Sequence, residues 1–297
     1  MNHRLYRQNH VLKGLLVVAV LLLTVAGCRE ATDTEQQNAV YYWRTELKVD
    51  ETEQKFLKDY HINKVYCRYF DVVMKTEPMP NATIRFTDKR VDDGVELVPT
   101  VFIMEDCMHE RHEGLARKLV NRIIQINKTH DVKNVNEIQI DCDYTRRSRR
   151  LYYEFLEELV SAAREHGLRV STTIRLHQLS MPAPPVDDGV LMLYNTGDPM
   201  NFAERNSILD MRDVKPYLHA LADYPLPLAA AYPVFLWQRT IQGVNIRHEA
   251  APEEILRVKE AVENERPELK NRILTYHLDK ENINRYKPET YEAIYHH

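Results

Sequence analysis

The stretch NEIQIDCDY at residues 136–144 decides the fold of this chain. Side chains alternate between the two faces of a β-strand, so apolar residues share one face here and polar residues share the other. The two sets are Ile138, Ile140 and Cys142 against Gln139, Asp141 and Asp143. The apolar face suits a covering layer of helices. The polar face suits the inside of a closed sheet, where side chains at the carboxyl ends of the strands form the site.

On both sides of this strand, β-branched and aromatic runs alternate with amphipathic segments. Strands are expected at residues 40–45, 64–72, 97–103, 137–143, 169–175, 189–195, 226–234 and 273–277. Helices are expected at residues 51–60, 115–127, 149–165, 214–221, 252–264 and 288–295. This alternation over residues 39–297 predicts an α/β fold, a single (β/α)8 TIM barrel in one domain. An open doubly wound sheet is the alternative.

Two connections are expected to depart from a regular barrel. Residues 176–188 read LHQLSMPAPPVDD, and prolines in this segment forbid a regular helix, so the crossover between the fifth and sixth strands should be irregular. Residues 83–86, between the second and third strands, are a short extra apolar piece that suits a small hairpin arm.

The N-terminal segment has the features of a targeting signal rather than of a folded domain. Basic residues precede an apolar run from Leu15 to Ala26 that is too short for a comfortable membrane span. The run ends in Val-Ala-Gly-Cys at 25–28, which resembles the bacterial lipobox. Residues 1–27 are therefore expected to be a lipoprotein signal peptide, Cys28 the lipidated residue and residues 28–38 a flexible tether to the cell envelope, most naturally the outer membrane. An ordinary signal peptide with an incidental cysteine is the alternative.

Composition excludes several classes of function. Removal of the three basic residues of the signal leaves 37 Lys and Arg against 44 Asp and Glu, a formal charge of −7, which disfavours nucleic acid as a partner. The 8 glycines never cluster, so no loop of the kind that cradles nucleotide phosphates is present. No cofactor and no metal are expected. The three remaining cysteines, Cys67, Cys107 and Cys142, cannot all pair, so disulfides do not build the fold.

The two carboxylates of the fourth strand are the strongest candidates for chemistry. Asp141 and Asp143 are separated by one residue and can perturb each other, so that one holds its proton near neutral pH while the other stays ionised. A general acid beside an electrostatic stabiliser is what glycoside hydrolysis needs. The alternative is a structural ion pair with Arg68 or Arg175 on a neighbouring strand.

The same strand resembles the chitinase-like barrels of glycoside hydrolase family eighteen. Their motif D-G-x-D-x-D-x-E has five defined positions, occupied here by Asn136, Glu137, Gln139, Asp141 and Asp143, with identity only at Asp141. This resemblance implies that Asp143 is the acid and that Asp141 orients the acetamido group of the substrate. Aspartate is one methylene shorter than the glutamate of the motif, a retreat of roughly 1.5 Å, when a misplacement of about 1 Å costs a hundredfold in rate.

Two further strands carry the resemblance. Residues 186–195 resemble V-D-x-x-x-x-M-x-Y-D after one additional residue, which implies that Tyr194 hydrogen-bonds the acetamido group. Residues 227–235 resemble the small-residue strand that follows in that family. The run IDCDYT at 140–145 and the later Tyr-Pro and Trp-Gln-Arg are also similar to a bacterial lipoprotein family of uncharacterised function.

Other side chains near the predicted strand ends suit a sugar site, because they offer hydrogen bonds or aromatic faces. They are Gln139, Arg68, Arg175, Asn195, Tyr232, Trp237, Gln238 and Trp43. The sequence thus predicts an envelope-anchored, carbohydrate-active barrel with a glycan or glycoconjugate as its partner, a glycoside hydrolase that uses Asp143, Asp141 and Tyr194. A barrel that binds a glycan or a protein partner without cleavage is the alternative, favoured by the missing glutamate.

Overall fold

The computed structural model describes residues 36–87, 91–92, 94–198, 205–241 and 244–296. The predicted signal peptide, Cys28 and most of the predicted tether lie outside the described residues. Residues 36–297 form one compact unit, and its first strand begins at Gln37. Within the described residues, no helix is both long enough and apolar enough to cross a membrane.

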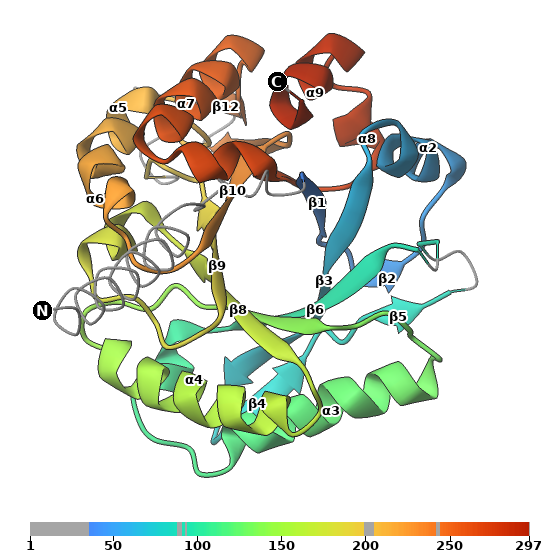
Figure 1. The fold of residues 1–297 in the computed structure, drawn as a ribbon, viewed down its shortest axis with the longest axis vertical. Helices are drawn as coiled ribbons and strands as arrows, with labels where there is room; N and C mark the ends of the chain where they lie inside the picture. The colour runs from blue at the N-terminus through green and yellow to red at the C-terminus, as the bar shows by residue number, and fades with distance from the viewer. Residues whose placement is uncertain (1–35, 88–90, 93, 199–204, 242–243, 297) are drawn as a thin grey trace, which may run out of the picture. The chain divides into compact units, whose positions relative to one another are not determined.

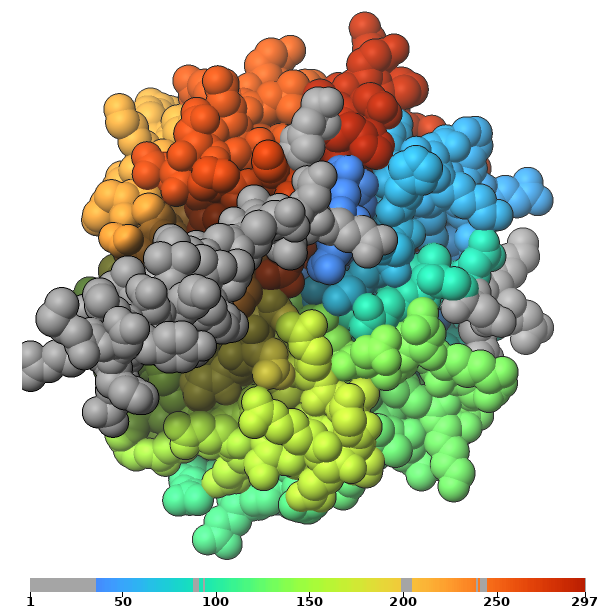
Figure 2. Space-filling view, in the orientation of Figure 1, coloured from blue at the N-terminus to red at the C-terminus, as the bar shows by residue number. Residues whose placement is uncertain are grey.

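Eight parallel strands form a closed barrel (Figure 1). They are β1 (Gln37–Tyr42), β3 (Ile62–Met74), β6 (Glu96–Ile103), β7 (Glu137–Asp141), β8 (Arg169–Ile174), β9 (Asp188–Met192), β10 (Leu228–Pro233) and β13 (Arg272–Tyr276). The ring closes because β1 pairs with both β3 and β13. The predicted (β/α)8 barrel is confirmed, and the open doubly wound sheet is wrong. The beginning and end of the described chain lie side by side, blue against red in Figure 2.

Helices occupy most of the connections and surround the strands (Figure 1). They are α2 (Glu51–Asp59), α3 (Leu115–Thr129), α4 (Arg149–Arg164), α5 (Met211–Val214), α6 (Leu218–Ala222), α7 (Pro252–Glu265), α8 (Lys280–Ile283) and α9 (Pro288–Tyr295). Short 3₁₀ turns are η1 (Glu105–Met108), η2 (Leu176–Ser180), η3 (Lys215–Tyr217) and η4 (Pro267–Asn271). The crossover from β8 to β9 contains only η2 and an irregular proline-bearing segment, as the prolines predict.

Strands outside the barrel modify two of its connections. β4 (Pro78–Asn81) pairs antiparallel with β3, and β5 (Arg85–Phe86) pairs with β2 (Glu46–Leu47). These two strands take the place of the small arm expected near residues 83–86. A hairpin that the sequence analysis did not predict follows β10 and consists of β11 (Leu236–Ile241) and β12 (Val244–Glu249).

The alternation of apolar and polar residues in β7 has the predicted sense. Ile138, Ile140 and Cys142 belong to the outer core, which also contains the apolar faces of the helices. Gln139 and Asp141 are buried on the opposite, inner side. The inner core is small and consists of strand residues such as Tyr41, Tyr66, Val190 and Ala231. Cys67, Cys107 and Cys142 are buried and free.

Ion pairs close the amino end of the barrel. Lys64 lies 2.8 Å from Glu137, the first residue of β7, and the Ser171 hydroxyl donates to the same carboxylate. Arg272 donates to Asp188 at 2.8 Å, and Arg169 pairs with the other oxygen of Asp188. Each of these carboxylates therefore has a cationic partner, as buried carboxylates require. Candidate reactive groups are to be sought at the carboxyl ends of the strands.

Candidate functional site

A cavity of about 590 Å³ opens at the carboxyl ends of the strands from β7 to β10; we call it the mouth cavity. Six of the predicted site residues line it: Asp143, Arg175, Tyr194, Asn195, Trp237 and Gln238. Five further residues complete its lining: Leu176, His177, Met192, Thr196 and Tyr217. Of these, Tyr217 lies in the 3₁₀ turn η3, where no sequence pattern pointed to the site.

A ladder of facing side chains between β7 and β8 builds one side of the mouth. The parallel register pairs Gln139 with Ser171 and Ile140 with Thr172, a constant offset along the two strands. Two rungs higher, Thr173 donates to Asp141 at 2.7 Å, and Arg175 binds Asp143 at the edge of the barrel. The register alone therefore brings each polar residue of β7 to a donor on β8.

Asp143 is half exposed and fully paired with arginine. Its side chain is 50% exposed, and its two oxygens accept from Nε and Nη2 of Arg175, the latter at 3.1 Å. The structural ion pair that the sequence left as an alternative is therefore present, with Arg175 as the partner. Such a forked pair consists of two charge-assisted hydrogen bonds, so both oxygens of Asp143 already have a donor.

Asp141 lies below the mouth cavity and is only 4% exposed. Burial raises the pKa of Asp141 to about 6, with Arg175 acting to lower it and Asp143 to raise it. Asp141 does not itself line the mouth cavity. The carboxyl group with the raised pKa is therefore Asp141, whereas the family resemblance gives the role of acid to Asp143.

Aromatic residues form the floor beside these carboxylates. The ring of Tyr194 stacks on Tyr276 with centroids 4.6 Å apart, and Phe235 meets Tyr194 edge to face. Within the described part of the chain, the buried hydroxyl of Tyr194 has no hydrogen-bond partner. An unpaired buried hydroxyl is destabilising, and Tyr194 carries this hydroxyl beside the mouth cavity.

The β11–β12 hairpin supplies the opposite wall. Trp237 and Gln238, at the start of β11, both line the mouth cavity. The Trp237 ring packs against His248 of β12 with centroids 4.6 Å apart, and the ring of His248 accepts from the Ser207 amide. Trp237 is thus held in place with part of its surface exposed, as a sugar-stacking residue requires.

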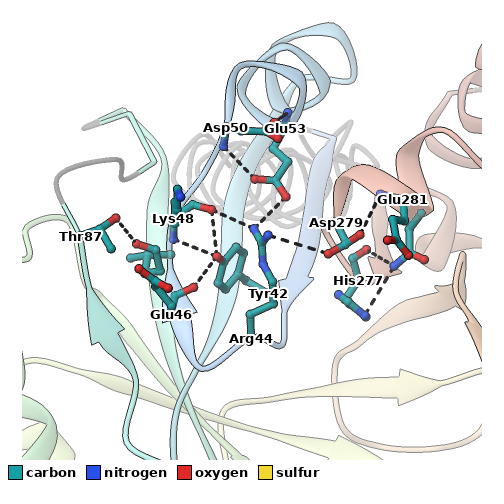
Figure 3. Close-up of polar contacts among 12 residues, drawn as sticks. Tyr42, Arg44, Glu46, Lys48, Asp50, Glu53, Thr87, His277, Asp279 and Glu281 are labelled. Atoms are coloured by element: carbon teal, nitrogen blue, oxygen red, sulfur yellow. Dashed lines mark hydrogen bonds and ion pairs between the residues drawn. The ribbon is translucent and has the colours of Figure 1, made fainter.

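Trp43 follows the end of β1, Arg68 lies in the middle of β3, and neither residue lines the mouth cavity. The Arg68 guanidinium lies 5.7 Å from the Trp43 ring and pairs with Asp71. Arg44, the next residue after Trp43, donates to Glu53 at 2.7 Å (Figure 3).

Further contacts hold the same stretch of chain. Arg44 also donates to the Lys48 carbonyl at 2.9 Å and lies 3.8 Å from Asp279 (Figure 3). The end of β1 is therefore fixed to α2 and to the start of α8 by a structural network.

Besides Trp43 and Arg68, two more predicted substrate-binding residues lie away from the cavity. Tyr232 is fully buried in the outer core, because the alternation of β10 turns Ala229 and Ala231 inward and Tyr232 toward the helices. Gln139 is fully buried inside the barrel, where its side-chain oxygen accepts from the Tyr41 hydroxyl at 3.0 Å. Neither side chain lines the mouth cavity.

Comparison with known proteins gives a fold and no family. No protein-family model and no curated protein sequence matches the chain. Among solved structures, the spore cortex-lytic enzyme SleL of Bacillus megaterium QM B1551 is similar with a TM-score of 0.58 and 12% identity, over 88% of this chain and 73% of SleL. A chitinase from Bacteroides thetaiotaomicron is similar with a TM-score of 0.57 and 13% identity, over 88% of this chain and 96% of the chitinase.

A chitinase from Chromobacterium violaceum ATCC 12472 gives a TM-score of 0.56 at 11% identity, over 87% of this chain and 98% of that chain. At such identities the likeness is one of fold. The chain is a TIM barrel that is similar in fold to these solved structures.

Proposed function

We propose that this chain binds a glycan in the mouth cavity. The observation that carries the proposal is that Asp143, Tyr194 and Trp237 line one open cavity at the carboxyl ends of a closed barrel. Asp143 follows β7, Tyr194 follows β9 and Trp237 lies in β11. That end of a TIM barrel is where ligands bind. The similarity in fold to chitinases and to SleL supports a carbohydrate rather than another small molecule.

The lining residues offer what a sugar ring needs. Trp237 presents an aromatic face, on which the apolar face of a sugar stacks. The exposed edge of the Asp143 and Arg175 pair offers both acceptors and donors to hydroxyl groups. Tyr194 offers a hydroxyl that no other described residue uses.

Glycoside hydrolysis is the second candidate function, favoured by the raised pKa of Asp141 two residues from Asp143. A carboxyl group with a pKa of about 6 is in part protonated near neutral pH, which is the property of a general acid. Direct protonation of a leaving group by Asp143 requires release from Arg175, because both oxygens of Asp143 accept hydrogen bonds from that guanidinium. Binding needs no such release, so binding is the function that the geometry supports best.

The two tryptophans of the chain provide a matched test of binding. We expect Trp237→Ala to weaken glycan binding about tenfold, since the loss of an aromatic contact and of the area that it buries costs on the order of 1.5 kcal/mol. Trp43→Ala should bind like the parent, because Trp43 does not line the mouth cavity. Calorimetric titration with chito-oligosaccharides and with hits from a glycan array gives the dissociation constants. Equal losses in both variants, or no glycan bound at all, would contradict the proposal.

Hydrolysis is tested on any glycan that the parent binds. Release of reducing ends by the parent, lost in Asp143→Asn and retained in Trp43→Ala, would establish cleavage. Intact glycan after prolonged incubation at high protein concentration would leave binding as the function.

We also propose that Cys28 is lipidated and anchors the barrel in the cell envelope, at the outer membrane. The support is the lipobox-like sequence at residues 25–28. Metabolic labelling with a clickable fatty acid should mark the parent and not Cys28→Ala. Equal labelling of both proteins would refute the lipid anchor and would leave the proposed glycan binding by the barrel unaffected.

A further inference from the structure

A second cavity of about 480 Å³ adjoins the mouth cavity and shares two lining residues with it, His177 and Tyr217. Its other lining residues come from the loop between β7 and α4 and from the crossover after β8: Thr145, Arg146, Ser180 and Met181. The two cavities therefore adjoin along His177 and Tyr217. A linear ligand seated in the mouth cavity has room to continue over these two residues.

The two cavities differ in charge. In the mouth cavity, Arg175 is neutralised by Asp143. In the second cavity, Arg146 is exposed and takes part in no ion pair with another described residue, and no carboxylate is among the lining residues. Partial burial lowers the pKa of His177, so its ring is neutral at pH 7 and the charge of the second cavity comes from Arg146.

One carboxylate lies near this cavity. Glu105 accepts from the Thr145 hydroxyl at 3.0 Å and also contacts His109 at 2.7 Å. It is thus held by its own partners and does not line the cavity. The surface that a ligand meets there is positive.

We infer that the two cavities form one groove for an acidic glycan, with sugar rings in the mouth cavity and a carboxylate or sulfate group on Arg146. The inference rests on the proposed function and adds the class of glycan to it. An arginine fork matches the paired oxygens of a carboxylate or sulfate group. The two cavities are continuous through His177 and Tyr217, so one glycan can place its rings in the mouth cavity and its acidic group on Arg146.

The test uses the full chain on an array that carries polygalacturonate, chondroitin sulfate and heparin oligosaccharides beside their carboxyl-reduced or desulfated forms and beside chito-oligosaccharides. We expect acidic members to bind about tenfold tighter than their matched neutral forms. Arg146→Ala should abolish that difference and leave the affinity for neutral forms unchanged. The preference should also shrink as ionic strength rises. The carboxylated and sulfated pairs show which anion Arg146 binds.

Arg150→Ala is the control, because Arg150 carries the same charge four residues away, pairs with Glu154 and lines neither cavity. The inference is overturned if acidic and neutral forms bind equally, if only neutral glycans bind, or if both arginine variants lose the same affinity. In those cases glycan binding itself stands. Absence of binding to every member overturns the proposed function as well.

Discussion

The side chain of Asp141 costs free energy when it ionises in the folded barrel. Burial raises its pKa from 3.8 to about 6, so between these values the folded state holds a proton that the unfolded state has lost. The free energy of unfolding must therefore fall as pH rises through this window. The shift corresponds to about 3 kcal/mol, fully present as lost stability above pH 7 and absent below about pH 4.

Asp141→Asn should remove this pH dependence, because asparagine keeps an oxygen for the Thr173 hydroxyl and carries no charge. We expect the free energy of unfolding of the variant to equal that of the parent near pH 4 and to exceed it by up to about 3 kcal/mol at pH 7. Urea denaturation over that pH range measures both. Asp143→Asn is the control, since Asp143 is half exposed. Parallel pH profiles for Asp141→Asn and the parent would show that Asp141 ionises freely.

Tyr194 is expected to serve binding at the expense of stability. Tyr194→Phe removes a buried hydroxyl that has no partner among the described residues, so the free energy of unfolding should stay equal or rise by about 1 kcal/mol. Glycan affinity should fall, because Tyr194 lines the proposed site.

Tyr232→Phe is the matched control for Tyr194. Its hydroxyl is also buried and unpaired within the described chain, yet it faces the outer core. The two variants should change stability alike, as measured by thermal unfolding, and only Tyr194→Phe should weaken binding. Equal glycan affinities of the two variants would show that the Tyr194 hydroxyl does not contact the ligand.

At the scale of elements, strand alternation predicted which side chains of β7 enter the barrel. It did not predict the partner of Asp143, because alternation within one strand does not show which strands lie beside it. Arg68 and Arg175 were therefore equal alternatives in the sequence. In the structure β8, which Arg175 follows, pairs with β7 directly, whereas β3, which carries Arg68, is separated from β7 by β6.

The β11–β12 hairpin shows where sequence reasoning stopped short. Trp237 was predicted to lie just beyond a barrel strand, but the wall that holds it was missed. Ile241 pairs with Val244, which leaves a two-residue connection containing Gly243 between two strands of alternating residues. That spacing is a hairpin signal. The position of Tyr217 had no such signal, because a loop residue enters a site only through the packing of its neighbours.

The contacts of Arg44 predict how helix α2 holds the end of β1 (Figure 3). Glu53 is almost fully buried. Its carboxylate accepts from the backbone amide of the N-cap residue Asp50, which completes a capping box, and it also accepts from Arg44. We expect Glu53→Ala to lower the free energy of unfolding by about 2 kcal/mol, less than a fully buried pair would lose, because Arg44 stays one-third exposed.

Glu53→Gln should cost less, since glutamine also completes a capping box. Urea denaturation of the two variants measures the difference. Equal losses would mean that the charge of Glu53, and not its hydrogen bonds, holds the helix.

For the whole molecule, the strand-and-helix rhythm predicted a closed barrel before any pairing was known. The ion pairs that seal its amino end could not be foreseen. Lys64 and Glu137 lie on strands that are not adjacent in the ring, and only the curvature of the closed sheet brings them to 2.8 Å.

Closure depends on β1, which is the first described strand and pairs with both β3 and β13. All eight barrel strands lie within residues 36–297, so a chain that begins at Gln36 should fold with the cooperative unfolding of the full chain. A chain that begins at Trp43 lacks β1 and leaves two unpaired edges, β3 and β13. Unpaired edges of this kind promote aggregation. We expect soluble, folded protein from the first truncation and aggregated or unfolded protein from the second, as judged by circular dichroism and size-exclusion chromatography. A folded product from the Trp43 truncation would show that seven strands suffice, and that the barrel is not held closed by its first strand.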